Sequence, residues 1–429
     1  MNNHGNKNLV IIGGGAVGLT SAVHASNIAK QNNYNLNIII LEKLDRVGKK
    51  ILSTGNGRCN FTNINMDFNN FYHIDQNFNN FDSFINFFLQ EFSVEDAIKF
   101  FYDLGVLHTV LNSGKVYPFS EQASAILDAL RNKIENTTNI TTKTQFDVNK
   151  IKVAGNNKFL INNNINADAI IFATGGLASP KLGSDGSGIK LLKSLGHSST
   201  KLTPALVQLK TSNTNSLKAL KGIKITGNLK IYGDINNKST FLREDFGEIL
   251  FTDYGISGPP VFQLSTLFAR YNNLVAYLDF MPNYSEYQIF NILKDRRTSL
   301  SYTNLENYFN GLLNKRLGNI IAKNCGIEKL SFIVENLEDK TLKKMAKLIK
   351  NFELKIIDTN GFNNAQVTAG GLKLSEFNNK TLESKIIKNL YCAGEILDVV
   401  GDCGGYNLQW AWSSSYIATK SCINSLYKS

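Results

Sequence analysis

Short apolar runs and a longer segment of small residues alternate near the start of the chain. Residues 9–12 form an apolar run, residues 19–33 are rich in Ala, Ser and aliphatic side chains, and residues 35–41 (NLNIIIL) form a second apolar run. Such short runs are typical of buried strands, and the segment between them has the length of a helix. The pattern predicts a β-α-β unit of a parallel sheet.

The next segments predict more helices and a hairpin. Residues 69–107 are rich in Phe and helical in pattern, and residues 123–135 predict another helix. Residues 146–151 and 158–161 are strand-like and predict a hairpin whose turn lies at residues 154–157 (AGNN).

The pattern changes in the middle third of the chain. Short alternating stretches between residues 202 and 280 predict an antiparallel, barrel-like or sandwich-like piece. Residues 285–350 are helical in pattern with many Lys and Arg, and residues 352–357 return to strand. Residues 389–428 predict a strand, a glycine-rich loop and a helix.

We therefore predict an α/β fold in which a Rossmann-type dinucleotide-binding domain is interrupted by a long insertion. The discontinuous domain comprises residues 1–195 and 355–429. The insertion comprises a β-rich, barrel-like domain at residues 196–284 and a small, basic helical domain at residues 285–354.

The first predicted strand leads into a glycine fingerprint of the form G-x-G-x-x-G. Gly13 permits a tight turn, Gly15 lets a pyrophosphate approach the backbone, and Gly18 lets the helix pack on the strand. The phosphates then lie at the helix N-terminus, where free N–H groups favour negative charge. Glu42 ends the second strand and is placed to bind a ribose hydroxyl, which favours FAD or NAD over NADP.

Only one such fingerprint is present in the sequence. A protein with separate Rossmann domains for FAD and for NAD(P) would carry two. Any nicotinamide cofactor therefore binds transiently or not at all.

Other glycine clusters follow predicted strands. Residues 168–173 (DAIIFA) form a strand that ends in residues 173–176 (ATGG); the nearby residues 185–188 (DGSG) suit a ligand contact and a plain helix start equally well. Residues 392–395 (CAGE) close a strand, and residues 401–409 (GDCGGYNLQ) open a helix. In a flavoprotein, the N–H groups there would face the flavin N1/O2 edge, which becomes negative on reduction.

Cysteine usage and charge narrow the function classes. The five cysteines are widely spaced, no CxxC is present and the five histidines have no paired spacing, so neither a disulfide framework nor a metal site is predicted. The net charge is +11, and residues 197–352 hold 21 Lys and Arg against 13 Asp and Glu. A solvated surface and a polyanion-binding face both explain this excess.

The apolar runs are too short for a membrane span, which needs roughly 18 residues. The polar residues 1–8 lead into a strand and not into a signal-peptide core. We expect a cytoplasmic protein without a membrane or DNA partner. The sequence leaves the oligomeric state open.

A series of motifs resembles the BaiN/RdsA-like family of FAD-dependent oxidoreductases. In chain order these are residues 13–18, Glu42, 53–60 (STGNGRCN), 114–118, 173–176, 247–259, 368–371, 393–398 and 404–412 (GGYNLQWAW). The resemblance covers nearly the whole chain, and GNGRCN and GGYNLQWAW are its most specific stretches. It implies a fold similar to the flavoprotein side of fumarate reductases. Related sequences often have His at the position of Asp253, so no histidine role is carried over there.

The resemblance implies a bound FAD. Arg58 and Asn60 would run along the flavin, Glu395 and Asp398 would reach the ribityl chain, and residues 405–407 would reach the ring. The full set of implied FAD-binding residues is Gly13, Gly15, Ala16, Val17, Gly18, Glu42, Lys43, Lys49, Gly57, Arg58, Cys59, Asn60, Ala173, Thr174, Gly175, Gly176, Asp185, Gly394, Glu395, Asp398, Gly404, Gly405, Tyr406 and Asn407.

FAD on this scaffold indicates redox chemistry without naming the substrate. The family includes enzymes that reduce uridine to dihydrouridine in 23S ribosomal RNA, and the basic insertion suits an RNA or large-subunit assembly particle as partner. Our leading hypothesis is this reaction, with NAD(P)H as a transient reductant. A flavin-dependent reductase or oxidase of a small molecule and a non-catalytic, flavin-binding, ribosome-associated protein stay as alternatives.

Uridine reduction needs a flipped-out base, a hydride at C6 and an acid that protonates C5. Cys403 is the candidate acid because it adjoins the presumed flavin loop, although a packing role is equally open; Cys59 and Tyr406 are alternatives. A basic cluster supplies candidate RNA contacts, which a solvated helix face explains equally well. Its members are Lys340, Lys343, Lys344, Lys347 and Lys350.

Overall fold

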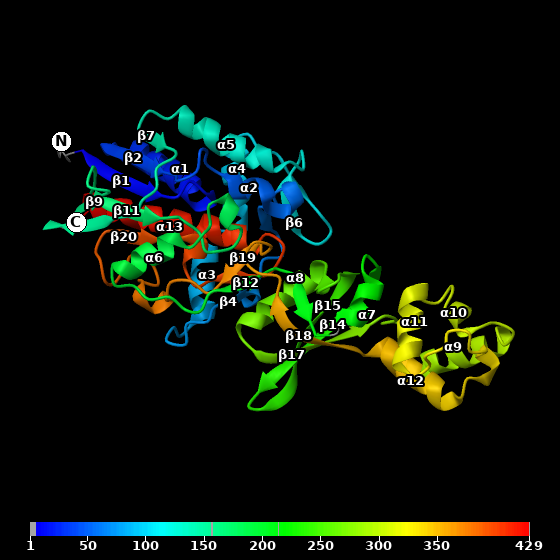
Figure 1. Cartoon of the computed structure of the whole chain (residues 1–429). Helices are drawn as coiled ribbons and strands as arrows, with labels where there is room; N and C mark the ends of the chain where they lie inside the picture. The colour runs from blue at the N-terminus through cyan, green and yellow to red at the C-terminus, as the bar shows by residue number, and fades with distance from the viewer. Residues whose placement is uncertain (1–5, 156–157, 213, 429) are drawn as a thin grey trace. The chain divides into compact units, whose positions relative to one another are not determined.

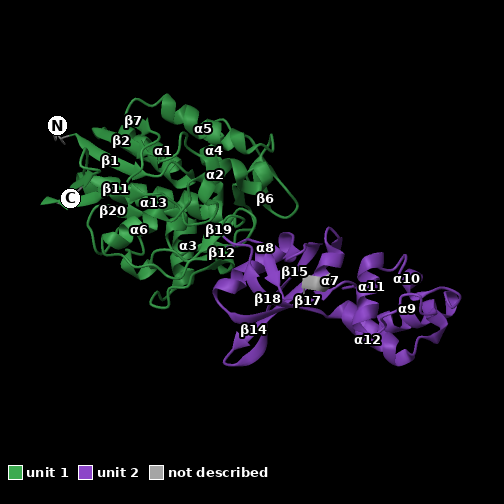
Figure 2. Cartoon of the chain, viewed as in Figure 1, with its two compact units in different colours: residues 1–204, 362–429 green, residues 205–361 purple. Residues whose placement is uncertain are grey.

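The structure, a computed structural model, divides the chain into two compact units (Figure 2). Unit 1 consists of residues 1–204 and 362–429, and unit 2 consists of residues 205–361. Unit 2 is thus an insertion between two segments of unit 1. The described parts of the chain are residues 6–155, 158–212 and 214–428.

Five parallel strands form the main sheet of unit 1, in the order β20-β11-β1-β2-β7. Their bounds are β1 Lys7–Ile12, β2 Leu36–Leu41, β7 Ile140–Lys143, β11 Ala169–Phe172 and β20 Leu390–Cys392. Every residue of β11 is buried, as expected for a strand covered on both faces of a parallel sheet. The pairing of β11 with β20 brings both ends of the chain into one sheet.

Helices α1 (Ala16–Gln31) and α13 (Tyr406–Lys428) pack against each other beside this sheet (Figure 1). The hydroxyls of Thr20 and Ser415 lie 2.9 Å apart in their interface. The rings of Tyr34 and Tyr427 stack with centroids 4.1 Å apart. The predicted β-α-β unit and the Rossmann-type α/β fold are therefore confirmed.

Smaller elements complete unit 1. The helices are α2 Lys49–Ser53, α3 Phe81–Glu91, α4 Val94–Asp103, α5 Ala123–Glu135 and α6 Ser187–Ser194. The antiparallel sheets are β3 Thr62–Asn63 with β6 Lys115–Pro118 and β5 His108–Val110; β8 Ile151–Ala154 with β9 Lys158–Ile161 and β10 Ile165–Ala167; and β4 Phe71–Tyr72 with β21 Val400–Gly401. A further pair joins β12 Thr203–Ala205 and β19 Val367–Ala369.

Two predicted elements are shorter than the sequence suggested. The helical prediction for residues 69–107 holds for α3 and α4, which a capping box at Ser93 separates. The Asn-rich residues before α3 favour turns, because Asn side chains bond to nearby backbone. The hairpin forms between β8 and β9 but residues 146–150 lie outside it, and the predicted turn residues Asn156 and Asn157 lie outside the described residues.

Unit 2 combines a closed barrel with a group of helices. The barrel strands are β13 Leu209–Thr211, β16 Gly255–Ser257, β15 Lys238–Phe251, β14 Lys224–Ile235, β17 Asn272–Asp279 and β18 Phe352–Thr359. The helices are α7 Thr214–Leu220, α8 Pro259–Ser265, α9 Glu286–Ser299, α10 Leu305–Tyr308, α11 Lys315–Asn324 and α12 Asp339–Lys350. The sequence predicts an insertion over residues 196–354, whereas unit 2 spans residues 205–361. Its last strand, β18, continues to Thr359 because it closes the barrel between β13 and β17.

Across the described residues, no helix combines the length and apolar character that a membrane span requires.

Candidate functional site

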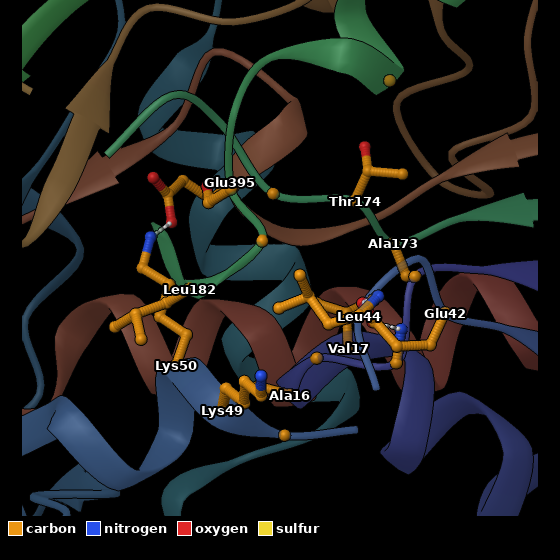
Figure 3. Close-up of a pocket in the computed structure, with 18 of the residues that line it drawn as sticks. Ala16, Val17, Glu42, Leu44, Lys49, Lys50, Ala173, Thr174, Leu182 and Glu395 are labelled. Atoms are coloured by element: carbon orange, nitrogen blue, oxygen red, sulfur yellow. Dashed lines mark hydrogen bonds and ion pairs between the residues drawn. The ribbon is translucent and has the colours of Figure 1, made fainter. Parts of the chain in front are cut away.

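A pocket in unit 1 lies at the carboxyl ends of three neighbouring strands (Figure 3). Its walls include residues 13–17 after β1, residues 42–44 after β2 and residues 173–175 after β11. Because β1 lies between β2 and β11, the three segments meet at one edge of the sheet. Ligands of parallel sheets bind at this edge.

The three fingerprint glycines have different surroundings. A side chain at Gly13 would place its Cβ 2.5 Å from the Ala173 carbonyl oxygen, and one at Gly18 would place its Cβ 1.9 Å from the Gly13 carbonyl oxygen. At Gly15 the same construction meets no atom within 4 Å. Gly13 and Gly18 are therefore required by packing, whereas Gly15 leaves space that a ligand can fill.

The start of α1 is suited to an anion. Gly15 is its N-cap and has no side chain to accept the free N–H groups, and no acidic residue lies in the first turn. Free N–H groups and the helix dipole both favour a phosphate at this position. The space at Gly15 and these donors fit the pyrophosphate of a dinucleotide.

Glu42 is held in place by backbone hydrogen bonds. Its Oε2 accepts from the Gly14 N–H at 2.8 Å, and its Oε1 accepts from the Leu44 N–H at 2.8 Å. The carboxylate is buried at the pocket wall. Each oxygen keeps a lone pair for a ribose hydroxyl, as the sequence predicts.

The other end of the pocket is assembled from distant segments. The ammonium of Lys50 lies 2.8 Å from Glu395 Oε2, the pair joined by a dashed line in Figure 3. Glu395 Oε1 accepts from the Thr368 N–H at 3.0 Å. Asn407 also lines the pocket, but its amide bonds to the backbone of Gly401 and therefore stabilises the loop before α13.

About half of the predicted cofactor residues line this pocket. They are Gly13, Gly15, Ala16, Val17, Glu42, Lys43, Lys49, Ala173, Thr174, Gly175, Glu395 and Asn407. The sequence reasoning missed several further lining residues, among them Arg46, Lys50, Thr54, Phe146, Gln366 and Trp410. Thr54 and Trp410 lie within motifs that the sequence singles out and Lys50 lies three residues before one, whereas nothing in the local sequence distinguishes Phe146.

Comparison with known proteins identifies the family. The family model described as the HI0933-like protein Rossmann domain matches residues 7–421. The chain belongs to this HI0933-like family.

Curated relatives agree with this family assignment. The chain is 36% identical over 416 residues to 3-dehydro-bile acid delta(4,6)-reductase of Clostridium scindens, covering 95% of this chain and 97% of the relative. It is 28% identical over 413 residues to the ribosomal RNA dihydrouridine synthase of Haemophilus influenzae, covering 95% and 96%. FrdA of the Escherichia coli quinol fumarate reductase is 14% identical with a TM-score of 0.49, covering 99% of this chain and 71% of that one.

Membership of the HI0933-like family confirms the resemblance drawn from the motifs. Together with the dinucleotide pocket, it makes the chain an FAD-dependent oxidoreductase with a Rossmann-type FAD-binding fold. The residues at the pocket fit FAD: the glycine fingerprint would hold the pyrophosphate, and Glu42 would hold the adenosine ribose.

The GNGRCN motif of the family lies beside the pocket and not in its wall. Arg58 forms an ion pair with Glu121, with Nη1 and Oε2 3.3 Å apart. The Asn60 amide donates to the carbonyl oxygens of Thr62 and Val116, both at 2.9 Å. These contacts tie the motif to the small sheet of β3, β6 and β5.

Two predicted carboxylates are engaged away from the pocket. Asp398 is fully buried, and its Oδ2 accepts from the N–H groups of Ile74 and Asp75 at 2.9 and 2.8 Å. Burial raises the pKa of Asp398 to about 6. Asp185 forms an ion pair with Lys43, so it positions a pocket residue instead of lining the pocket.

Three of the predicted glycines that lie outside the pocket wall are explained by close packing or by backbone conformation. A Cβ at Gly176 would lie 2.4 Å from Thr368 Oγ1, and one at Gly394 would lie 2.4 Å from Val17 Cγ2, so both permit close packing behind the pocket. Gly57 has a φ of +84°, which an L side chain rarely adopts.

The candidate acids differ in their access to a substrate. Cys59 is fully buried, and burial raises its pKa to about 12. The Tyr406 hydroxyl donates to the Asn65 carbonyl and accepts from the Asn70 amide, so its proton is engaged in the fold. Cys403 is half-buried in the loop before α13. Among the three, Cys403 is the least buried.

Helix α12 of unit 2 has one apolar and one basic face. Its buried residues are Leu342, Met345, Ala346 and Ile349. With Glu286 of α9, four of the RNA-contact candidates line a shallow groove: Lys340, Lys343, Lys344 and Lys347. We call these four residues the lysine face. Lys350 does not belong to it, because its ammonium forms an ion pair with the buried Asp279.

Proposed function

We propose that this FAD-dependent oxidoreductase reduces a carbon–carbon double bond conjugated to a carbonyl group. We further propose that the substrate is a uridine of 23S ribosomal RNA, which becomes dihydrouridine with NAD(P)H as the electron donor. The observation that carries the first step is that relatives aligned over 95% of the chain are named for two such reductions. In a 3-oxo-4,6-diene and in uridine alike, the double bond is conjugated to a carbonyl.

The chemistry needs a hydride, a proton and an enclosed site. Reduced FAD supplies the hydride. Cys403 donates the proton to the carbon next to the carbonyl, since it is the most accessible of the candidate acids. The single dinucleotide fingerprint supports a nicotinamide that reduces the flavin and then leaves.

The lysine face supports RNA as the substrate. Within the described chain, none of its four lysines forms an ion pair, whereas other exposed lysines of unit 2 do, such as Lys221 with Asp253 and Lys315 with Glu306. Four ammonium groups without an ion pair on one helix would attract a polyanion such as RNA more strongly than an uncharged metabolite.

A small-molecule enone is the second candidate. The 36% identity to the bile acid reductase is higher than the 28% identity to the ribosomal RNA enzyme, which favours a steroid-like substrate. The basic surface would then be a solvated face without a role in catalysis.

The deciding experiment measures dihydrouridine in purified large-subunit ribosomal RNA by nucleoside mass spectrometry. A strain lacking the gene is compared with its parent and with strains complemented by the wild type or by a variant with all four lysines of the lysine face changed to Gln. We expect loss of dihydrouridine in the deletion strain, restoration by the wild type and weaker restoration by the variant. Equal dihydrouridine in deletion strain and parent would favour the enone substrate.

A further inference from the structure

A polar group of side chains lies on one face of the small sheet of β3, β6 and β5. The register pairs Asn63 with Lys115 and Thr109 with Tyr117, so these four side chains point to the same side. The Asn63 amide donates to the Gly404 carbonyl at 2.9 Å. A Cβ at Gly404 would lie 3.0 Å from Lys115 Cε. This face therefore meets the loop that carries Cys403 and leads into α13.

Tyr117 is buried with an unused hydroxyl. The residue is 5% exposed, and among the described residues no group hydrogen-bonds its phenol oxygen. The Arg58 guanidinium lies over the ring at 4.8 Å, and Cys403 and Cys59 are both near enough to act on the phenol electrostatically. Burial raises the pKa of Tyr117, so it keeps its proton at neutral pH. The hydroxyl is therefore available to donate to a ligand.

Lys115 is the second unused donor on this face. Within the described ranges, its ammonium has neither an ion pair nor a hydrogen bond, although Arg58 nearby is neutralised by Glu121. The group adjoins the FAD pocket, since Asn407 lines that pocket three residues after Gly404. An ammonium and a phenol thus lie together beside the candidate acid.

We propose that Lys115 and Tyr117 form a subsite that binds the carbonyl oxygen of the substrate. This inference rests on the proposed reduction of a conjugated double bond and holds for uridine and for an enone. Hydride adds to the far carbon of the double bond, and the π electrons move onto the carbonyl oxygen. The ammonium and the phenol stabilise that negative charge. The Cys403 thiol then gives its proton to the near carbon and regains one from solvent, which completes the addition of one hydride and one proton.

The test separates substrate reduction from the rest of the cycle. Holoenzyme reduced with dithionite under anaerobic conditions is mixed with 23S ribosomal RNA lacking dihydrouridine or with a 3-oxo-4,6-diene steroid, and flavin reoxidation is followed by absorbance. We expect Lys115→Met and Tyr117→Phe each to slow reoxidation about 100-fold, the usual effect of losing one oxyanion donor. Lys115→Arg keeps the charge and should recover part of the rate.

Matched controls are Lys99→Met and Tyr102→Phe, which remove the same groups from exposed positions on α4. They should reoxidise at the wild-type rate, and all variants should retain FAD. Wild-type rates in both Lys115→Met and Tyr117→Phe would overturn the subsite.

If the wild type reduces neither substrate, the proposed function is wrong. A binding probe then tests the subsite separately. The probe is 2-cyclohexen-1-one, titrated into oxidised holoenzyme while the flavin absorbance is recorded. The subsite predicts a spectral change that weakens at least about tenfold in both variants. No change in the wild type, or equal changes in all variants, would overturn it.

Discussion

The two ends of the FAD pocket are built in different ways. At the fingerprint end, Gly13, Gly15, Gly18 and Glu42 all belong to one β-α-β unit. At the loop end, Lys50 bonds to Glu395, a residue 345 positions away in the sequence. The fingerprint end is therefore defined by local sequence, whereas the loop end exists only once the N- and C-terminal segments share a sheet.

This difference separates binding from chemistry. The fingerprint end offers backbone donors and one carboxylate, which suit the constant part of the cofactor. The loop end adjoins the loop of Cys403, beside which Lys115 and Tyr117 lie, and a thiol, a phenol and an ammonium group suit a reaction. Substitutions at the first end should change cofactor affinity, and substitutions at the second should change turnover.

The largest effect is expected for Cys403→Ala at the loop end. Without the proton donor, reoxidation of the reduced enzyme by substrate should slow by about 1,000-fold, within the range for a lost general acid. FAD content should not change, because Cys403 lies outside the pocket wall. Stopped-flow absorbance at the flavin band measures the rate.

Cys59→Ala is the matched control for that experiment. Cys59 is a buried thiol with its pKa raised to about 12, so its loss should lower stability while turnover per bound FAD is retained. The assignment of the acid is wrong if Cys403→Ala turns over at the wild-type rate. If Cys59→Ala is slow despite a normal FAD content, Cys59 is the proton donor instead.

At the fingerprint end, Gly18→Ala and Gly15→Ala should have separate effects. A Cβ at position 18 would lie 1.9 Å from a backbone oxygen, so the apoprotein should lose more than about 3 kcal/mol of unfolding free energy. A Cβ at position 15 meets no protein atom within 4 Å, so Gly15→Ala should keep a near-normal apoprotein and weaken FAD binding tenfold or more, about 1.4 kcal/mol.

Urea unfolding of the apoproteins and fluorescence titration with FAD measure these two quantities. If Gly15→Ala binds FAD as tightly as the wild type, the pyrophosphate does not lie at Gly15. If Gly18→Ala is as stable as the wild type, α1 can move away from the turn at Gly13 without loss of stability, and the close packing at Gly18 is not required.

The sequence predicts the fingerprint end well because each role there depends on spacing within one unit. It predicts the loop end only through the resemblance, and there the placement of individual residues differs. Arg58 and Asp398 belong to motifs, yet Arg58 pairs with Glu121 and Asp398 caps backbone at Ile74 and Asp75. Lys115 and Tyr117 lie in the motif at residues 114–118, yet only the register of a short sheet shows that they share a face beside the loop of Cys403.

Asp398→Asn tests whether that buried carboxylate serves the fold or the cofactor. Its pKa is raised by burial to about 6 in the folded chain, against 3.8 for the unfolded group. The folded state therefore binds the extra proton between these values, and stability from this group falls as pH rises from about 4 to about 6.

Asn remains neutral and can still accept from both backbone N–H groups, so the variant should gain up to about 3 kcal/mol over the wild type between pH 4 and pH 7. Thermal unfolding across this range measures the difference. FAD affinity should not change, since Asp398 does not line the pocket. A large loss of FAD affinity, together with a stability difference that does not change with pH, would instead indicate that Asp398 binds the ribityl chain.

Glu42→Gln is the mildest change and the sharpest test of the fingerprint end. Both Glu42 oxygens accept backbone N–H groups, so the amide of Gln must turn one N–H₂ toward a donor. That repulsion and the lost charge should weaken FAD binding about tenfold. Glu135→Gln, at an exposed position at the end of α5, is the control and should bind FAD normally.

Once Glu42→Gln is saturated with FAD, it should reduce substrate at the wild-type rate, because the chemistry lies at the other end of the pocket. A slow, fully loaded Glu42→Gln enzyme would show that the two ends are coupled and that the division of binding from chemistry fails.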